Sequence, residues 1–178
     1  AVYVYPDAPA DELLFALDHS GAVMALGHDQ EQIDKILACA PKVPRIRRAV
    51  FVEERGLWSY DDPRLISFRN LVAAGEGFEA ADWVERQIAA GRSTDPAAYC
   101  YTSGTTSRPK AAVLSHAFIL DNAHRLMGAL DVRPGGNYLS YISPAWAAEQ
   151  FFGIALPLLA PMVVHFAEKP DTIQHDLR

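Results

Sequence analysis

The chain has 178 residues, of which 50% are apolar and 21% are charged, a composition typical of a globular protein with material for a sizeable core. Its formal net charge of −6 argues against nucleic acid as a partner, because no basic stripe is present to neutralise phosphates. Two cysteines fit a reducing compartment, and the longest apolar run, residues 151–164, is too interrupted by proline and glycine to span a membrane. We therefore expect a cytoplasmic protein without a transmembrane segment. Peripheral membrane association and oligomeric state, a homodimer included, stay open.

The first half of the chain alternates between helical and strand-like patterns. Leucines recur at helical spacing within residues 10–19, and Trp83, Val84 and Ile88 fall on one face of a later helical stretch. Short apolar runs bounded by turn residues are typical of strands. We predict helices at 10–19, 29–38, 65–74 and 78–90, and strands at 22–26 and 47–52.

The second half continues this alternation around one polar loop. Ser115 is a candidate N-cap for a helix over 117–130, which the sequence Pro134-Gly-Gly is expected to end. The other predicted elements are strands at 97–101, 112–114, 137–142 and 161–166 and a helix at 146–159. This order predicts an α/β fold with a largely parallel sheet, in which ligands bind where strands end.

The most informative stretch is 101–110, Tyr-Thr-Ser-Gly-Thr-Thr-Ser-Arg-Pro-Lys, which joins two of these strands. Its hydroxyls and backbone N–H groups supply neutral donors, and Lys110 supplies one mobile positive charge, so the loop suits a polyphosphate. The Walker A spacing is absent, and the lysine follows a proline on a turn into a strand rather than opening a helix. The residues therefore indicate a phosphate-binding loop of a different kind.

The segment YTSGTTSRPKAAVLSH (101–116) resembles the phosphate-loop motif of the adenylate-forming superfamily, YTSGTTGxPKGVxLSH. Flanking segments at 5–26, 29–37, 57–68 and 168–178 are similar to bacterial long-chain fatty acyl-CoA synthetases. Ser107 and Ala111 replace two glycines of the motif, each at a cost of about 1 kcal/mol if its backbone needs a positive φ. The resemblance implies that residues 1–178 are part of the large N-terminal AMP-binding domain, without the later Tyr-Gly-x-Thr-Glu motif or the small C-terminal domain.

The resemblance also implies roles for the loop residues. Lys110 would be the catalytic residue and would contact the departing pyrophosphate, while the remainder of the loop wraps the ATP phosphates. The implied ATP-binding set is Thr102, Ser103, Gly104, Thr105, Thr106, Ser107 and Lys110. Thr105 or Thr106 would help to hold Mg²⁺ through a hydroxyl, since hard oxygen ligands suit this ion. The alternative is an ordinary Ser/Thr-rich turn, against which the order of the matching residues argues.

A second segment, YISPAWAAEQ (141–150), resembles the next motif of the superfamily. The resemblance places Trp146 in the acyl pocket, with Glu149 at an acidic position of the long-chain branch. The alternative for Trp146 is a core residue at a helix start. No histidines or cysteines stand at metal-ligand spacing, and Ser115-His116 lacks the Gly-x-Ser-x-Gly elbow of a hydrolase nucleophile.

The implied function is that of an AMP-forming long-chain fatty acid–CoA ligase, which takes a fatty acid, ATP with Mg²⁺, and CoA. The 178 residues alone would be inactive. Two alternatives stay open. One is another adenylate-forming enzyme, an acyl-AMP or aryl-CoA ligase. The other is a non-catalytic domain that binds nucleotide or mediates assembly.

Overall fold

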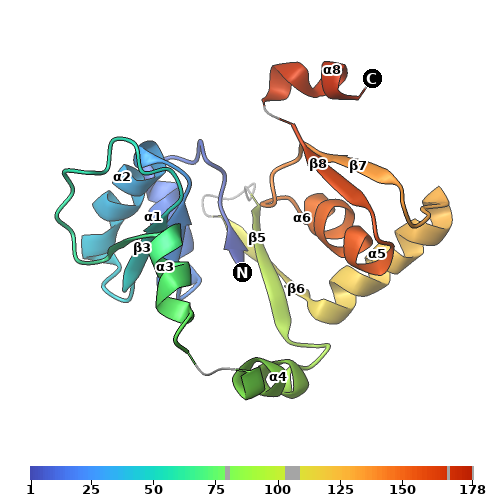
Figure 1. The fold of residues 1–178 in the computed structure, drawn as a ribbon, viewed down its shortest axis with the longest axis horizontal. Coiled ribbons are helices and arrows are strands. Elements are labelled where there is room, and N and C mark those ends of the chain that lie inside the picture. Colours follow the sequence, from blue (N-terminus) through green and yellow to red (C-terminus); the bar gives the residue numbers. More distant parts are fainter. Residues whose placement is uncertain (79–80, 103–108, 168, 178) are drawn as a thin grey trace. The chain divides into compact units, whose positions relative to one another are not determined.

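The fold was analysed in a computed structural model that describes residues 1–78, 81–102, 109–167 and 169–177. The chain forms two compact units (Figure 1). Pro6–Ala90 make up one, which we call the N-terminal unit, and Ala1–Tyr5 together with Gly91–Arg178 make up the other, which we call the hairpin unit. Both units contain helices and strands, so the predicted α/β class is confirmed.

The N-terminal unit has a parallel sheet in the order β2 (Met24–Gly27), β3 (Arg48–Phe51), β4 (Leu65–Ser67). Its helices are α1 (Ala10–His19), α2 (Gln30–Cys39), α3 (Phe68–Gly75) and α4 (Ala81–Ala90), with a 3₁₀ turn at η1 (Ala40–Lys42). Asp29 caps α2 by accepting a hydrogen bond from the Gln32 backbone N–H. The α2 side chains Ile33 and Ile36 are buried with Val43 and Ala49 in one core. Apolar burial between α2 and the sheet therefore holds this unit together.

Two predictions for this unit need correction. Residues 65–74 were expected to form one helix, but Leu65–Ser67 form strand β4 because they pair in parallel with β3. Ser67 then caps α3 by accepting a hydrogen bond from the Asn70 backbone N–H. The helix expected at 78–90 begins at Ala81 as α4, and residues 79 and 80 lie outside the described residues. Its apolar face of Trp83, Val84 and Ile88 is exposed.

The hairpin unit contains two sheets. One has the order β1 (Val2–Tyr3), β5 (Pro96–Thr102), β6 (Lys110–Ser115), and the other pairs β7 (Asn137–Ser140) with β8 (Val163–Phe166). β1–β5 and β7–β8 are parallel, whereas β5 and β6 run antiparallel. The described strands thus form three sheets, mostly parallel, rather than the one sheet expected from the sequence. A 3₁₀ turn η3 (Pro170–Thr172) and α8 (Ile173–Asp176) follow β8.

Helix α5 (His116–Leu130) follows β6 directly. Ser115 accepts a hydrogen bond from the Phe118 backbone N–H, which confirms the predicted N-cap. The helix ends at Leu130, and its C-cap Asp131 has a left-handed φ of 49°, three residues before the Pro134-Gly-Gly that was expected to end it. The left-handed backbone of this aspartate therefore ends the helix before the chain reaches the proline.

The helix predicted over 146–159 is divided into three segments. They are α6 (Ala147–Glu149), the π-helical η2 (Gln150–Ala155) and α7 (Leu156–Leu159). Pro157 lies in the first turn of α7, where an α-helix tolerates the missing N–H of proline. The π-helical segment η2 ends at Ala155, directly before α7 begins. No helix in the described residues is long and apolar enough to cross a membrane.

Candidate functional site

The two described ends of the hydroxyl-rich loop lie opposite each other at the open end of the β5–β6 hairpin. Thr102 and Lys110 are register partners, and the Thr102 hydroxyl lies 3.4 Å from the Lys110 carbonyl oxygen, to which it donates a weak hydrogen bond. The end of β5 and the start of β6 therefore lie side by side. Ser103, Gly104, Thr105, Thr106 and Ser107 lie outside the described residues.

Lys110 is exposed and is placed by its backbone rather than by side-chain partners. Within the part of the chain that the structure describes, it forms no ion pair. Its position is nonetheless fixed, because β6 is paired with β5 along its whole length. A cation held in this way is available to an anion from solvent.

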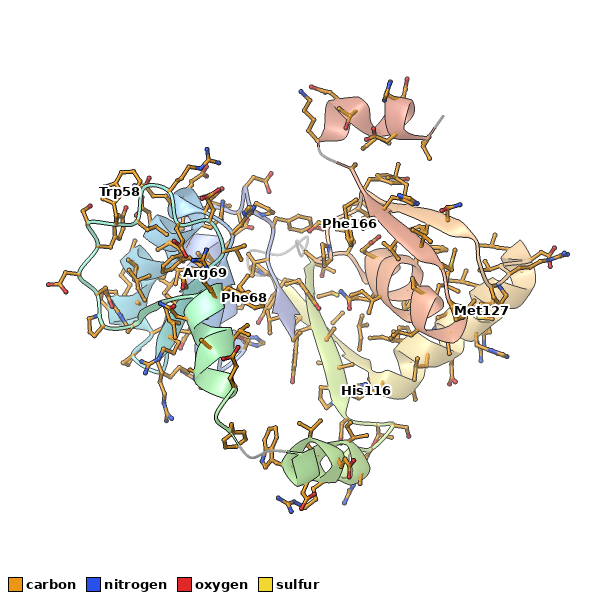
Figure 2. The ribbon with its side chains drawn as sticks, viewed as in Figure 1. Trp58, Phe68, Arg69, His116, Met127 and Phe166 are labelled. Carbon is orange, nitrogen blue, oxygen red and sulfur yellow. The ribbon has the colours of Figure 1, made fainter. Side chains whose placement is uncertain are left out.

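The stems of the hairpin are anchored on the core of the unit. Ala98 and Cys100 alternate along β5 toward that core, where they meet Leu114 of β6 and Ile119 of α5. Met127, labelled in Figure 2, packs against the same cluster from α5. Burial raises the pKa of the Cys100 thiol and of the Tyr101 phenol, which therefore stay neutral near pH 7. The strands that carry the loop are thus packed on an apolar core.

Trp146 and Glu149 have different surroundings although they are three residues apart. The Trp146 side chain is 56% exposed, so the alternative interpretation as a core residue is not supported. Its backbone N–H donates to the Ser143 carbonyl, 2.9 Å away, at the start of α6. Glu149 is only 2% exposed. One is available to a ligand and the other is enclosed by protein.

The Glu149 carboxylate accepts hydrogen bonds from two side chains of β7. The Tyr138 hydroxyl donates to Oε2 at 2.9 Å, and the Ser140 hydroxyl donates to Oε1 at 2.5 Å. Burial, with the hydrogen bond to Glu149, raises the pKa of Tyr138 above the usual range of a phenol. Next to Glu149, the buried Gln150 donates from Nε2 to the Pro144 carbonyl oxygen at 2.6 Å. We call Tyr138, Ser140, Glu149 and Gln150 the buried polar cluster.

Sequence reasoning did not identify Tyr138 or Ser140. Tyr138 and Ser140 stand two positions apart in a strand, so they share one face, and a polar pair on the inner face of a strand calls for a buried partner. Gly153 is a further residue that was missed, because a Cβ atom there would overlap Glu149 Oε1. Both signals require knowing which face of each element is buried.

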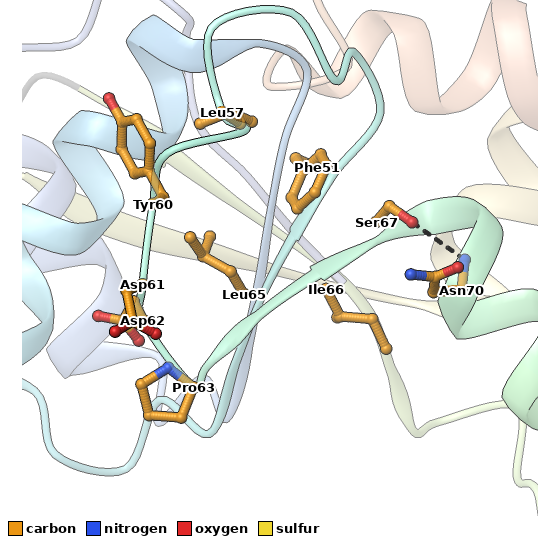
Figure 3. Close-up of a pocket in the computed structure, with 10 residues that line it drawn as sticks. All are labelled: Phe51, Leu57, Tyr60, Asp61, Asp62, Pro63, Leu65, Ile66, Ser67 and Asn70. Atoms are coloured by element: carbon orange, nitrogen blue, oxygen red, sulfur yellow. Dashed lines mark hydrogen bonds between the residues drawn. The ribbon is translucent and has the colours of Figure 1, made fainter.

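The N-terminal unit has a cavity of about 280 Å³ beside β3 and β4 (Figure 3). Phe51, Leu57 and Leu65 give it an apolar side, and the turn residues Asp61 and Asp62 lie at its edge. Asp62 is paired with Arg64 at 2.6 Å, and this partner lowers the pKa of the carboxyl to about 2. In the described residues, no group of His, Cys, Asp and Glu is arranged to hold a metal ion.

Comparison with known proteins places these features in a family. The model of the AMP-binding enzyme family matches residues 1–177. FadD15 of Mycobacterium bovis, a long-chain-fatty-acid–CoA ligase, is 29% identical over 133 residues, which are 75% of this chain and 20% of that protein. The peroxisomal long chain acyl-CoA synthetase 6 of Arabidopsis thaliana is 26% identical over 168 residues, which are 88% of this chain and 23% of that protein.

The fold has solved counterparts as well. ATP-bound MatB from Rhodopseudomonas palustris superposes with a TM-score of 0.67 at 23% identity, covering 97% of this chain and 31% of that one. The chain spans about a fifth to a quarter of the length of the curated relatives cited above. Because the family match covers nearly every residue, the conclusion is plain. This chain belongs to the AMP-binding enzyme family.

Proposed function

We propose that this chain is the phosphate-binding part of an AMP-forming acyl-CoA ligase that activates a long-chain fatty acid. In the first step a carboxylate oxygen attacks the α-phosphorus of ATP, and pyrophosphate leaves. In the second step the thiol of CoA attacks the acyl carbon, and AMP leaves. The observation that carries the proposal is the pairing of Thr102 with Lys110 at the open end of a hairpin whose loop has the superfamily's phosphate-binding residues.

Each loop residue has a role in this proposal. The hydroxyls and backbone N–H groups of residues 102–107 surround the ATP phosphates, and Lys110 neutralises the charge that develops on the departing pyrophosphate. The Thr105 and Thr106 hydroxyls are oxygen donors of the kind that Mg²⁺ accepts. The ion would supply further neutralisation of phosphate charge. This part of the chain therefore binds and orients ATP without a covalent nucleophile.

The fatty acid is proposed from the relatives and from one side chain. FadD15 and long chain acyl-CoA synthetase 6 are named for long acyl substrates, and Trp146 offers an exposed aromatic surface just after β7. Ligands of α/β proteins bind at the carboxyl ends of parallel strands, which is where this tryptophan follows β7. We propose Trp146 as a wall of the acyl pocket, with Glu149 serving the same pocket. The enzyme would act in the cytoplasm.

A titration of the chain with MgATP tests the phosphate-binding part. Lys110→Ala removes one charge-assisted contact, worth about 1.5–3 kcal/mol, so we expect MgATP to bind about 10–100-fold more weakly. Lys110→Arg keeps the charge and is expected to retain most of the affinity. Lys42→Ala, which removes an exposed lysine of the N-terminal unit, is the matched control. Equal affinities for Lys110→Ala and Lys42→Ala would contradict the proposal.

Fatty-acid-dependent ATP–pyrophosphate exchange tests the extent of the active site. We propose that the 178 residues are part of the N-terminal domain of the ligase and expect no exchange with palmitate from this chain alone. Exchange above the level of a palmitate-free sample would contradict that assignment. It would show that these residues contain a complete adenylation site.

A further inference from the structure

The segment between β7 and α6, residues 141–146, is short, and its backbone accepts a hydrogen bond from a side chain of the buried polar cluster. Just before the segment, at the end of β7, the Ser140 hydroxyl donates to Glu149 Oε1. In its middle, the Pro144 carbonyl accepts from Gln150 Nε2. Within the segment, the Ala145 N–H donates to the Ser143 hydroxyl at 3.2 Å. Side chains of α6 and η2 thus hold the end of β7 and the middle of the segment.

The side chains that hold this segment are buried, while the aromatic side chains that it carries are not. Glu149 and Gln150 are 2% and 3% exposed, but Tyr141 and Trp146 are each 56% exposed. Phe166, the register partner of Ser140 at the end of β8, is also exposed (Figure 2). Aromatic side chains at the carboxyl end of the β7–β8 pair are therefore exposed to solvent, whereas the side chains that hold this part of the backbone are buried.

Glu149 itself is held in one position. Both of its oxygens have donors, and Gly153 provides space for the carboxylate because a side chain there would overlap it. Among the described residues Glu149 has no cationic partner, so the two hydroxyls are what stabilise its position. Breaking such a fully bonded cluster costs more than losing an exposed hydrogen bond.

We propose that Glu149 and Gln150 are positioning residues that fix the segment 141–146 so that the Trp146 ring is presented to the acyl chain. They act through the backbone of this segment and do not touch the substrate. The inference rests on the proposed function for the identity of the acyl chain, and it changes the role expected of Glu149 from a pocket wall to a support beneath it.

The test reports on Trp146 alone. Trp58 and Trp83 are exposed, so Trp58→Phe and Trp83→Phe leave Trp146 as the single tryptophan at small cost. Time-resolved anisotropy then measures the mobility of the Trp146 ring. Quenching of its emission by a dibrominated stearate measures acyl binding. Gln150→Ala, Glu149→Gln and the control Gln174→Ala, at an exposed glutamine of α8, are compared in this background.

For Gln150→Ala we expect faster loss of Trp146 anisotropy and about tenfold weaker binding of the brominated stearate. MgATP affinity should not change, because the β5–β6 hairpin is a separate element. Glu149→Gln should give a smaller effect, since its amide carbonyl still accepts one hydroxyl, and this milder variant serves if Gln150→Ala fails to fold. Gln174→Ala should match the parent in every measurement.

A melting temperature that falls in Gln150→Ala, with the anisotropy and stearate affinity of the parent, would overturn the inference and leave a purely structural role. Absence of stearate quenching in the parent itself would overturn the proposed fatty-acid function, and with it the acyl part of this inference. Trp146 anisotropy distinguishes these two outcomes, because it measures the mobility of the segment 141–146 in the absence of any ligand.

Discussion

Lys110 and Glu149 are both charged side chains of the hairpin unit, but their surroundings are opposite. Lys110 is exposed at the end of a hairpin and forms no ion pair with a described residue. Glu149 is buried, and both of its oxygens accept hydrogen bonds from β7. An exposed charge on a fixed backbone can bind a ligand, whereas a buried carboxylate whose two oxygens each accept a hydrogen bond stabilises its own surroundings. The presence of a charged residue in a motif therefore does not establish that it contacts substrate.

The largest expected effect comes from crowding Glu149. Gly153→Ala places a Cβ atom on Glu149 Oε1, so the carboxylate must move away from Tyr138 and Ser140. We expect the free energy of unfolding of the hairpin unit to fall by about 3 kcal/mol, as for overpacking of a well-packed core. Urea unfolding, monitored by circular dichroism, measures this loss.

A double mutant separates this clash from other consequences of the alanine. In the Glu149→Ala background the overlapping carboxylate is absent, so Gly153→Ala should then cost less than about 1 kcal/mol. Equal costs in the two backgrounds would show that Glu149 is not held against Gly153. Glu149 would then not be fixed in its buried position, and the contrast with the exposed Lys110 would no longer hold.

A half-buried ion pair of the N-terminal unit offers an intermediate case. Arg64 donates to Asp62 at 2.6 Å and lowers the pKa of that carboxyl from 3.8 to about 2. Because the folded-state pKa lies below the unfolded one, the stabilisation is present above about pH 4 and is lost as the pH falls through about 2. Arg64→Ala should raise the pKa of Asp62 toward 3.8 and cost less than about 1 kcal/mol at neutral pH.

Carbon-13 NMR titration of the Asp62 carboxyl, with Arg55→Ala as the control, measures this shift. Arg55 pairs with Glu53 and not with Asp62, so its removal should leave the Asp62 titration unchanged. An Asp62 pKa that stays near 2 without Arg64 would contradict the assigned cause.

The smallest effect concerns the anchor of the hairpin. Burial raises the pKa of the Cys100 thiol, so little thiolate is present or accessible near pH 8, and alkylation by iodoacetamide should be far slower than in the urea-unfolded chain. Mass spectrometry of the modified peptide measures the rate at this site. Rapid alkylation in the native chain would mean that the β5 stem opens, and Lys110 would then lack the fixed backbone assigned to it.

Much of the local structure could be predicted because it depends on neighbouring residues. The bounds of α1 agree with the prediction, and the Ser115 cap marks the start of α5 as expected. The prediction of a helix over 65–74 was wrong at its start, because Leu65–Ser67 gain hydrogen bonds from β3, which is far away in the sequence. The antiparallel direction of β6 likewise depends on its pairing with β5.

The sequence by itself determined the family motif, the phosphate-binding residue types and the alternation of helices and strands, because each of these is written in adjacent positions. Only the tertiary structure decided that Trp146 is exposed and Glu149 buried, although the two are three residues apart. Burial depends on partners such as Tyr138 and Gly153, which the fold brings together from separate turns and strands. Composition and periodicity do not contain that information.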